Sequence, residues 1–314
     1  HEMVGEITEL GAEVTGLEVG QRVVRWGRMD DCLARGRTEL CSPCQRGHRV
    51  LCEYSSEPRE HEPVGGGFGD SFIAPASSLV PVPDGISDEQ AIFTEPTAVA
   101  IHAAWRRKPR SGEKILLIGC GTIGCLTLQV LRFLCSDCDI TAVVQFDWQG
   151  EMALALGADR FLVGIDNVYA QAPALTGAKR YEGMFSNVML LGGWDVVYDI
   201  VGVPATLNHA LRWARAGGTV VLVGANLRRM KLDLTPVWYQ EVDLIGAVGH
   251  DVVTWQGREV STFDLAMEWM MAGVIRTDPL LTHRFPLEDY RRAFAVATRD
   301  KAQARSVKVA FELR

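Results

Sequence analysis

Four cysteines in one polar, loop-like stretch are the first residues whose type and spacing could do chemistry. They are Cys32, Cys41, Cys44 and Cys52, and Cys41 and Cys44 form a C-x-x-C pair. Thiolates at such spacing bind zinc, and a chain of this length does not need them as a disulfide framework. We therefore predict a metal site here. The other four cysteines lie in or beside an apolar segment, and we expect small, buried, reduced side chains at Cys120, Cys125, Cys135 and Cys138.

A glycine-rich turn is the second chemical signal. Gly119, Gly121 and Gly124 form a G-x-G-x-x-G motif directly after an apolar strand and at the start of a helix. These glycines permit a tight turn, a close approach of the backbone to a pyrophosphate, and close helix–strand packing. The helix N-terminus then offers free N–H groups to phosphates. We predict a dinucleotide site that includes Thr122 and Ile123.

The residues after the next strand bear on the choice of dinucleotide. A carboxylate at this place holds the ribose 2′-hydroxyl of NAD, but the position is occupied by Gln145. Asp147 follows two residues later and either reaches the ribose or begins the next helix. No Arg or Lys stands beside Gln145 to attract a 2′-phosphate. The cofactor is therefore predicted as NAD or NADP.

The elements that position these residues change in character along the chain. Short strands are expected first, over 4–10, 21–25 and 71–74, followed by a helix over 88–102. Strands then alternate with helices, which predicts a parallel, doubly wound sheet. The expected strands are 114–118, 140–144, 195–200, 218–223 and 243–248, and the expected helices are 124–134 and 149–156. A helix over 263–272 and a β-like tail over 306–311 close the chain.

Composition excludes several classes of protein. Of 314 residues, 47% are apolar and 23% are charged, so the chain is not intrinsically disordered. The net charge of −7 argues against a nucleic-acid binder, and no apolar run is long enough for a membrane helix. We expect partners to be small molecules, with neither nucleic acid nor membrane among them. The reduced thiols and zinc fit a cytoplasmic location.

Further motifs along the whole chain resemble those of the zinc-dependent medium-chain alcohol dehydrogenases, the superfamily of sorbitol and threonine dehydrogenases. They are His1-Glu2 with Gly5 (G-H-E-x-x-G), Val19–Val23 (V-G-D-R-V), Glu95–His102 (E-P-L-x-V-x-x-H) and Thr282–Leu287 (T-H-R-F-P-L). The resemblance implies an α/β fold with a Rossmann domain inserted into a β-rich GroES-like catalytic domain. We assign residues 1–94 to an incomplete GroES-like domain with a zinc lobe at 30–56, residues 95–252 to the Rossmann domain, and residues 253–314 to the return segment.

The resemblance implies a structural zinc in the cysteine-rich lobe. The family spacing is C-x2-C-x2-C-x7-C, and Cys41, Cys44 and Cys52 match it, whereas Thr38 stands where the remaining cysteine is expected. Cys32 is the substitute that we favour, and His48 is a weaker candidate. A degenerate lobe without metal is the alternative.

The resemblance also implies a catalytic zinc. His1 and Glu95 match two of its ligands, and Glu2 matches a neighbouring carboxylate that can approach the metal. The resemblance implies a cysteine ligand as well, and it is expected upstream of His1. His1 is not a natural start, and the chain is interpreted as N-terminally truncated. His102 either lines the cleft or relays protons, or it is a hydrogen-bonded helix histidine.

Residues at the ends of later strands are further cofactor candidates. Val201 and Gly202 are candidates for the adenosine side. The resemblance implies that the backbone meets the nicotinamide at Val223, Gly224, Ala225, Ala247 and Val248. Trp238, Trp255 and Trp269 are expected in the core in preference to a cleft or a subunit contact.

Together these features imply hydride transfer between an alcohol or ketone substrate and NAD(P), with zinc as a Lewis acid. Glu95 favours the polyol and threonine branch, and the family implies a homodimer or homotetramer. Two alternatives are a zinc-free quinone or enoyl reductase of the same superfamily and an inactive dinucleotide-binding remnant.

Overall fold

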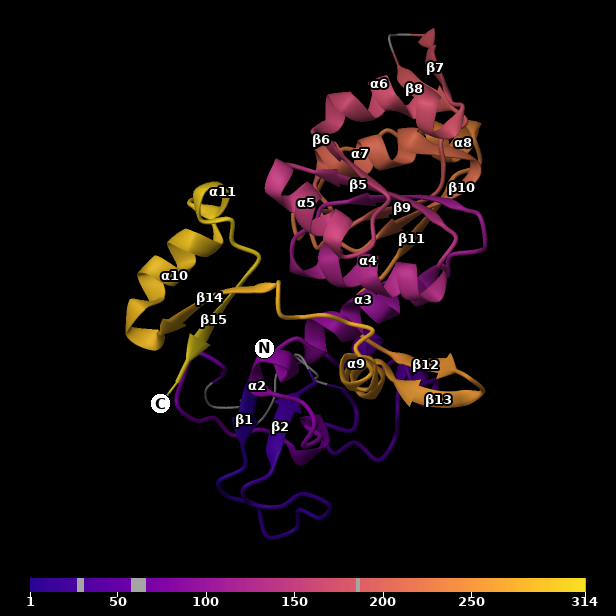
Figure 1. Ribbon diagram of the computed structural model, residues 1–314. Helices are drawn as coiled ribbons and strands as arrows, with labels where there is room; N and C mark the ends of the chain where they lie inside the picture. Colours follow the sequence, from indigo (N-terminus) through magenta and orange to yellow (C-terminus); the bar gives the residue numbers. More distant parts are fainter. Residues whose placement is uncertain (27–30, 58–65, 185–186, 314) are drawn as a thin grey trace. The chain divides into compact units, whose positions relative to one another are not determined.

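The computed structural model describes residues 1–26, 31–57, 66–184 and 187–313 (Figure 1). The chain divides into two compact units. Unit 1 comprises His1–His102 and Gly249–Arg314, and unit 2 comprises Ala103–Val248, so that unit 2 is inserted into unit 1 along the sequence. The sequence-based boundaries at 94 and 252 stand close to these two divisions.

Unit 2 is built on a six-stranded parallel sheet with the strand order β11-β10-β9-β4-β5-β6. Its strands are β4 (Lys114–Ile118), β5 (Asp139–Val144), β6 (Arg160–Val163), β9 (Trp194–Asp199), β10 (Ala214–Leu222) and β11 (Asp243–Gly246). Its helices are α4 (Thr122–Leu134), α5 (Asp147–Ala155), α6 (Ile165–Thr176), α7 (Pro204–Trp213) and α8 (Thr235–Tyr239). From β4 the chain first adds β5 and β6 on one side and then β9, β10 and β11 on the other, so the strand order reverses between β4 and β9. Sheets of this type bind dinucleotides in the crevice at such a reversal. The predicted doubly wound α/β fold is confirmed.

The central strands form because they are continuous apolar runs. Ile115, Leu116 and Leu117 of β4 are completely buried, as a strand covered on both faces requires. Trp194 at the start of β9 and Trp213 at the end of α7 are the largest fully buried side chains among the described residues, and both belong to one apolar cluster. The expected strand 114–118 is confirmed residue for residue.

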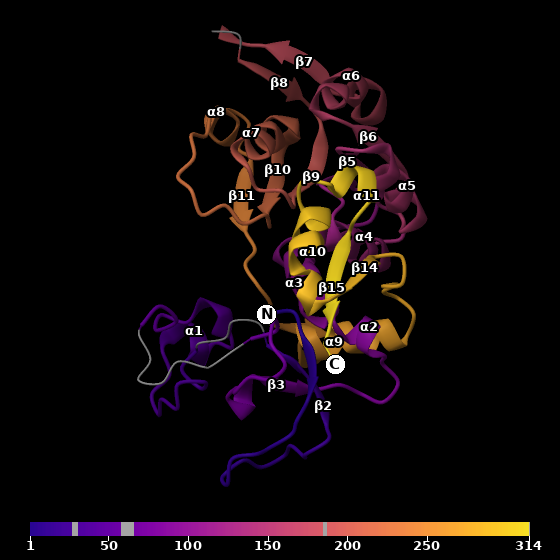
Figure 2. The same ribbon diagram turned by 90° about the vertical axis from the view of Figure 1, so that its left-hand side faces the viewer.

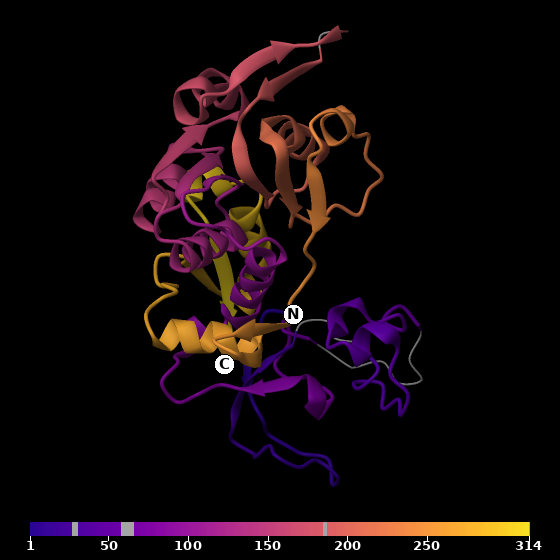
Figure 3. The same cartoon turned by 90° about the vertical axis from the view of Figure 1, so that its right-hand side faces the viewer.

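An antiparallel hairpin extends from unit 2 away from its central sheet (Figures 2 and 3). It consists of β7 (Lys179–Glu182) and β8 (Val188–Leu191). All four residues of β7 are exposed, so the strand has no buried face and no apolar periodicity. The sequence analysis therefore did not predict it.

The described strands of unit 1 form three small sheets. β1 (Val4–Glu6), β2 (Arg22–Arg25) and β3 (Leu79–Pro81) form an antiparallel sheet, β12 (Val252–Trp255) and β13 (Arg258–Ser261) form a hairpin, and β14 (Leu281–Pro286) and β15 (Lys308–Glu312) are parallel. Its helices are α1 (Ser42–Gln45), α2 (Asp88–Ala91), α3 (Thr94–Arg106), α9 (Thr262–Met271), α10 (Tyr290–Ala297) and α11 (Lys301–Ala304). The expected strand 71–74 is wrong, because the third strand of the first sheet is β3.

The expected helix 88–102 is two helices. Ser87 caps α2 through a reciprocal capping box with Gln90, and the short helix ends at Ala91. Helix α3 starts again at Thr94, continues past His102, and carries Glu95 in its first turn. The break therefore places Glu95 at a helix N-terminus, and α3 runs from unit 1 into unit 2.

Two expectations about side chains are wrong. Cys135 and Cys138 are buried as expected, but they are joined in a disulfide with a Cα–Cα distance of 5.6 Å, because the C-x-x-C turn after α4 brings them together. Trp238 is 80% exposed on the short helix α8, whereas Trp269 is buried and contacts Trp255 edge to face at 5.4 Å. In the described part of the chain, no helix is both long and apolar enough to cross a membrane.

Candidate functional site

The four lobe cysteines come together in unit 1. One ligand atom from each of Cys32, Cys41, Cys44 and Cys52 lies within 4.8 Å of the others, and all four side chains are buried. The Sγ atom of Cys52 is 3.8 Å from that of Cys32 and 3.8 Å from that of Cys41. This is a four-thiol cage of the kind that holds a structural zinc. The described part of the predicted lobe begins at Asp31.

Cys32 occupies the fourth corner of this cage. Its Sγ accepts a hydrogen bond from the Cys41 backbone N–H at 3.3 Å, whereas Thr38 is exposed and contributes nothing to the cluster. His48 is engaged elsewhere, because its Nδ1 lies 2.5 Å from the Asp251 carboxylate. The donor set therefore fits zinc with Cys32 in place of the residue at 38.

The cage also favours a thiolate. Burial alone raises the pKa of Cys41, but backbone N–H groups of Cys44 and Glu53 donate to its sulfur, and the net effect lowers its pKa to about 7. Burial raises the pKa of Cys44 instead. Because zinc binds thiolates and displaces their protons, Cys41 is the thiol best prepared for metal binding.

A second group of metal-ligand atoms lies at the start of the chain. His1, Glu2 and Glu95 each place one ligand atom within 4.8 Å of the others, and His1 Nε2 is 3.4 Å from Glu95 Oε1. The hydrogen bond to Glu95 raises the pKa of His1, and the charges of Glu95 and Glu2 add to this effect. An imidazole nitrogen and two carboxylate oxygens are suitable zinc ligands.

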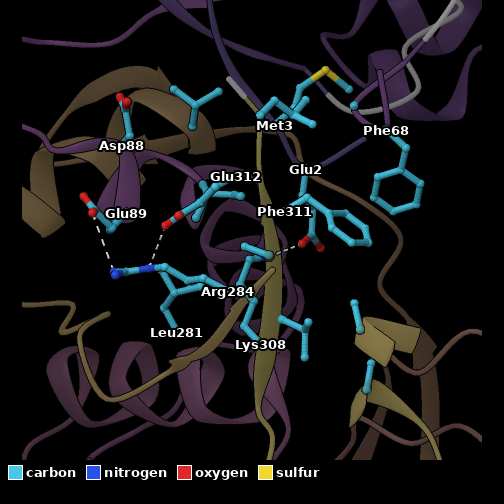
Figure 4. Close-up of a pocket in the computed structure, with 18 of the residues that line it drawn as sticks. Glu2, Met3, Phe68, Asp88, Glu89, Leu281, Arg284, Lys308, Phe311 and Glu312 are labelled. Atoms are coloured by element: carbon cyan, nitrogen blue, oxygen red, sulfur yellow. Dashed lines mark hydrogen bonds and ion pairs between the residues drawn. The ribbon is translucent and has the colours of Figure 1, made fainter. Parts of the chain in front are cut away.

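Glu2 is held by a buried lysine. The Lys308 ammonium on β15 pairs with the Glu2 carboxylate and lies 5.2 Å from the centre of the Phe93 ring, and only 7% of the Lys308 side chain is exposed. Glu2 and Lys308 line a pocket of about 740 Å³ in unit 1 (Figure 4). The same view shows Arg284 between Glu89 and Glu312, and all three residues line this pocket. Lys308 therefore fixes the position of the Glu2 carboxylate beside His1.

The substitution Glu2→Gln is expected to destabilise the metal-free protein by about 2 kcal/mol, because it leaves a buried ammonium without its partner. Glu312→Gln removes an exposed carboxylate 3.5 Å from Arg284 and should cost at most about 0.5 kcal/mol. Urea denaturation of both variants measures the difference. Equal losses of unfolding free energy would show that burial of Lys308 is unimportant.

Two further histidines belong to this part of unit 1. His102 is buried on α3, seven residues beyond Glu95 in the sequence. His250 is also buried, and the sequence analysis did not select it, because a single histidine after a strand carries no motif. Burial lowers the pKa of His250 to about 3, helped by the charges of His102, Arg49 and His1. His250 is therefore neutral at pH 7.

The glycine-rich turn of unit 2 has the geometry that the motif predicts. Gly119 has φ +95°, and a Cβ there would meet Val201 Cγ2 at 2.6 Å. A Cβ on Gly124 would lie 1.9 Å from the Gly119 carbonyl oxygen. Gly121 precedes α4, which begins at Thr122 and Ile123 and has no acidic residue in its first turn. The first turn of α4 therefore carries no negative charge that would oppose the binding of an anion at the helix N-terminus.

The end of β9 is tied to the end of β10. Asp199 is buried, and its Oδ1 accepts hydrogen bonds from the N–H groups of Val201 at 3.1 Å and Gly202 at 2.9 Å. A Cβ on Gly202 would lie 2.2 Å from the Gly224 carbonyl oxygen, so the two loops touch through their backbones. Asp199 therefore shapes the turn that carries Val201, which is 40% exposed beside the glycine-rich loop.

The remaining cofactor candidates lie at the same edge of the sheet, because parallel strands all end there. Gln145 is exposed directly after β5, and Asp147 is the first residue of α5. Both placements leave NAD and NADP open. Val223, Gly224 and Ala225 follow β10, and Ala247 and Val248 follow β11.

Comparison with known proteins agrees with these sites. A family model described as alcohol dehydrogenase GroES-like domain matches residues 1–84, and one described as zinc-binding dehydrogenase matches residues 122–269. The chain is 30% identical to L-idonate 5-dehydrogenase of Vitis vinifera over 100% of this chain and 78% of that protein. It is 29% identical to sorbitol dehydrogenase of Arabidopsis thaliana over 100% of this chain and 79% of that protein.

Among solved structures, 2R,3R-butanediol dehydrogenase from Bacillus subtilis is similar with a TM-score of 0.74 and 25% identity, over 98% of this chain and 78% of that one. The two domain models, their order along the chain and the similarity over the length of this chain agree with the sites described above. The chain therefore belongs to the zinc-dependent medium-chain alcohol dehydrogenases, the NAD(P)-dependent oxidoreductases of alcohols and polyols.

Proposed function

We propose that this protein oxidises a secondary alcohol or polyol with NAD(P)+, and reduces the corresponding ketone, at a zinc ion held by His1 and Glu95 with Glu2 beside them. The observation that carries the proposal is the convergence of these three side chains on one point in unit 1. Residues far apart in the sequence supply a nitrogen and two carboxylate oxygens there, the hard and borderline donors that suit a catalytic zinc.

When bound, zinc supplies Lewis-acid polarisation of the alcohol oxygen, and the nicotinamide takes up the hydride. His1 and Glu95 hold the metal, and Lys308 keeps Glu2 in place through its ion pair. In unit 2, Gly119, Gly121 and Gly124 with the N-terminus of α4 hold the pyrophosphate. The strand-end residues described above orient the rest of the cofactor.

A polyol-type substrate is favoured by the relatives. The similar proteins are named for idonate, sorbitol and butanediol, each of which carries a secondary hydroxyl group beside another hydroxyl. The carboxylate of Glu95, in place of a thiolate, is in line with the polyol branch of the resemblance. We therefore propose a vicinal hydroxyl as part of the substrate class.

Transfer of an isotopic label tests the proposed reaction. A secondary alcohol deuterated at the carbinol carbon is expected to deliver its deuterium to C4 of the nicotinamide, and mass spectrometry of the reduced cofactor detects it. A zinc-free reductase would reduce an activated double bond or a quinone and leave the alcohol untouched. A remnant would bind the dinucleotide but form no reduced cofactor from any alcohol.

We also propose a homodimer that pairs through β11. This strand lies at one edge of the central sheet of unit 2. Large apolar side chains are exposed on β11 and in the segment that leads to it from β10: Leu227, Leu234, Trp238, Tyr239 and Leu244. Exposed apolar patches of this kind mark subunit contacts. Sedimentation velocity measures the oligomeric state directly. A cytoplasmic location is proposed because the four lobe thiols must remain reduced to bind zinc.

A further inference from the structure

Three loops of unit 2 meet at the end of β5. The Gly119 N–H donates to the Val143 carbonyl oxygen at 2.8 Å, and the Gly164 N–H donates to the Val144 carbonyl oxygen at 2.9 Å. The loops after β4 and β6 are thereby bonded to the two residues that precede Gln145. Because a dinucleotide binds with its pyrophosphate at the glycine-rich turn and its ribose at the end of the next strand, the ribose belongs at this junction.

The junction contains no positively charged side chain. Residues 145–149 read Gln-Phe-Asp-Trp-Gln, and the loops 119–124 and 164–168 contain neither Lys nor Arg. The first cation after β5 is Arg160, which pairs with Asp139 at the opposite edge of the sheet, where β5 and β6 begin. The 2′-phosphate of NADP would therefore meet no cation from these three loops.

Backbone donors at the junction are already paired. The side-chain oxygen of Gln149 accepts the N–H groups of Gln145 at 3.2 Å and of Phe146 at 3.3 Å, and Gln149 is buried. A phosphate oxygen that took these two N–H groups would leave the Gln149 oxygen without a donor in a buried place, which is costly. The end of β5 is therefore not prepared to bind a phosphate.

The charge that does stand at the junction is negative. Asp147 is the first residue of α5, its side chain is exposed, and it has no ion pair in the part of the chain that the structure describes. Asp166 adds a second carboxylate in the first turn of α6. A carboxylate accepts a hydrogen bond from a ribose hydroxyl, but it repels a phosphate monoester, which carries about −1.5 to −2 charges at pH 7.

We propose that this protein uses NAD and discriminates against NADP, and that Asp147 is the residue that accepts the ribose 2′-hydroxyl and repels a 2′-phosphate. The proposal rests on the proposed function only in placing a dinucleotide at the glycine-rich turn, so binding tests it without turnover. The partial positive charge at the N-terminus of α5 opposes the discrimination, and the Asp147 carboxylate in the first turn offsets it.

The test measures the Kd of NADH and of NADPH by energy transfer from tryptophan to the reduced nicotinamide, a chromophore that the two cofactors share. In wild type we expect the Kd of NADPH to be at least about tenfold that of NADH. Asp147→Asn keeps the size of the side chain and removes its charge, so the ratio should fall at least about threefold. Added salt should also lower the wild-type ratio, because it screens exposed charges, whereas a steric preference would not change.

Two further variants test the position of the charge. Asp243→Asn is the matched control, because Asp243 is exposed at the start of β11, at the edge of the sheet opposite to the strand ends. It should keep the wild-type ratio of the two Kd values. Asp166→Asn should change this ratio less than Asp147→Asn, since the ribose is assigned to the end of β5 and not to the end of β6.

Equal affinities in wild type, or tighter binding of NADPH, would overturn the proposal. A preference for NADH that Asp147→Asn leaves unchanged, or that Asp166→Asn changes more, would overturn the assignment to Asp147. If wild type binds NADH tightly and rejects NADPH but oxidises no alcohol, the proposed function fails and the cofactor preference stands. If wild type binds neither dinucleotide, both fail.

Discussion

Replacing Cys32 with serine is expected to lower the affinity of the lobe for zinc by at least about a hundredfold. Loss of an outer-shell partner of a metal ligand already costs roughly 10- to 100-fold, and a lost ligand costs more. The effect reaches the fold, because the buried cluster of the lobe consists of Cys32, Cys41, Cys44 and Cys52. Among the described residues, the partly buried apolar side chains packed against it are Leu40 and Tyr54. Zinc binding there is therefore folding free energy for this segment.

Thr38→Ala is the matched control for Cys32→Ser, because Thr38 is exposed and stands where the family spacing places a cysteine. We expect it to keep the zinc content of wild type. Competition with a chromophoric chelator measures the affinity, and limited proteolysis reports the order of the lobe. Wild-type zinc affinity in Cys32→Ser, or loss of zinc from Thr38→Ala, would show that Cys32 is not the fourth ligand.

Replacing Gly124 with alanine is expected to cost about 3 kcal/mol or more of stability. The added Cβ would lie 1.9 Å from the Gly119 carbonyl oxygen, a backbone atom that can move only if the turn or α4 moves. Dinucleotide affinity should fall at least about tenfold, because that movement displaces the helix N-terminus from the phosphates. The helix-propensity gain of alanine over glycine, about 1 kcal/mol, is too small to compensate.

Gly5→Ala is the control for Gly124→Ala, since a Cβ at Gly5 has no atom within 4 Å. Its unfolding free energy should stay within about 0.5 kcal/mol of wild type. Denaturation by urea and quenching of tryptophan fluorescence by the dinucleotide measure the two effects. If Gly124→Ala bound the dinucleotide with the affinity of wild type, Gly124 would not be required for the phosphate site.

The sequence predicted the parts of the fold in which local pattern and burial agree. The apolar run 114–118 is buried on both sides as β4. After it, glycine is needed at Gly119, which approaches Val201, and at Gly124, which approaches the Gly119 carbonyl oxygen. The motif spacing placed the fourth ligand at Thr38, and Cys32 was favoured as its substitute. The structure brings the Cys32 sulfur into the cluster. These features depend on residues close in sequence or on one recognisable motif.

The sequence did not predict features that depend on tertiary partners. Strand 71–74 looked extended, but β2 pairs instead with Leu79–Pro81. The hairpin β7–β8 is exposed along β7 and lacks a pattern, and Trp238 is exposed although its type suggested the core. The ring of His250 packs on Trp26, which is remote in the chain, so no local pattern could have predicted its burial.

The central claim is that this protein forms NAD(P)H from an alcohol and that zinc at His1 and Glu95 is required. The most direct measurement is the near-ultraviolet absorbance of NAD(P)H formed from a polyol, before zinc removal by a chelator, after removal, and after its return. We predict formation by the zinc-loaded protein, loss on removal and recovery on return. Formation at an undiminished rate in protein shown to be free of zinc, or no formation by fully loaded protein with any polyol or secondary alcohol, would contradict the account.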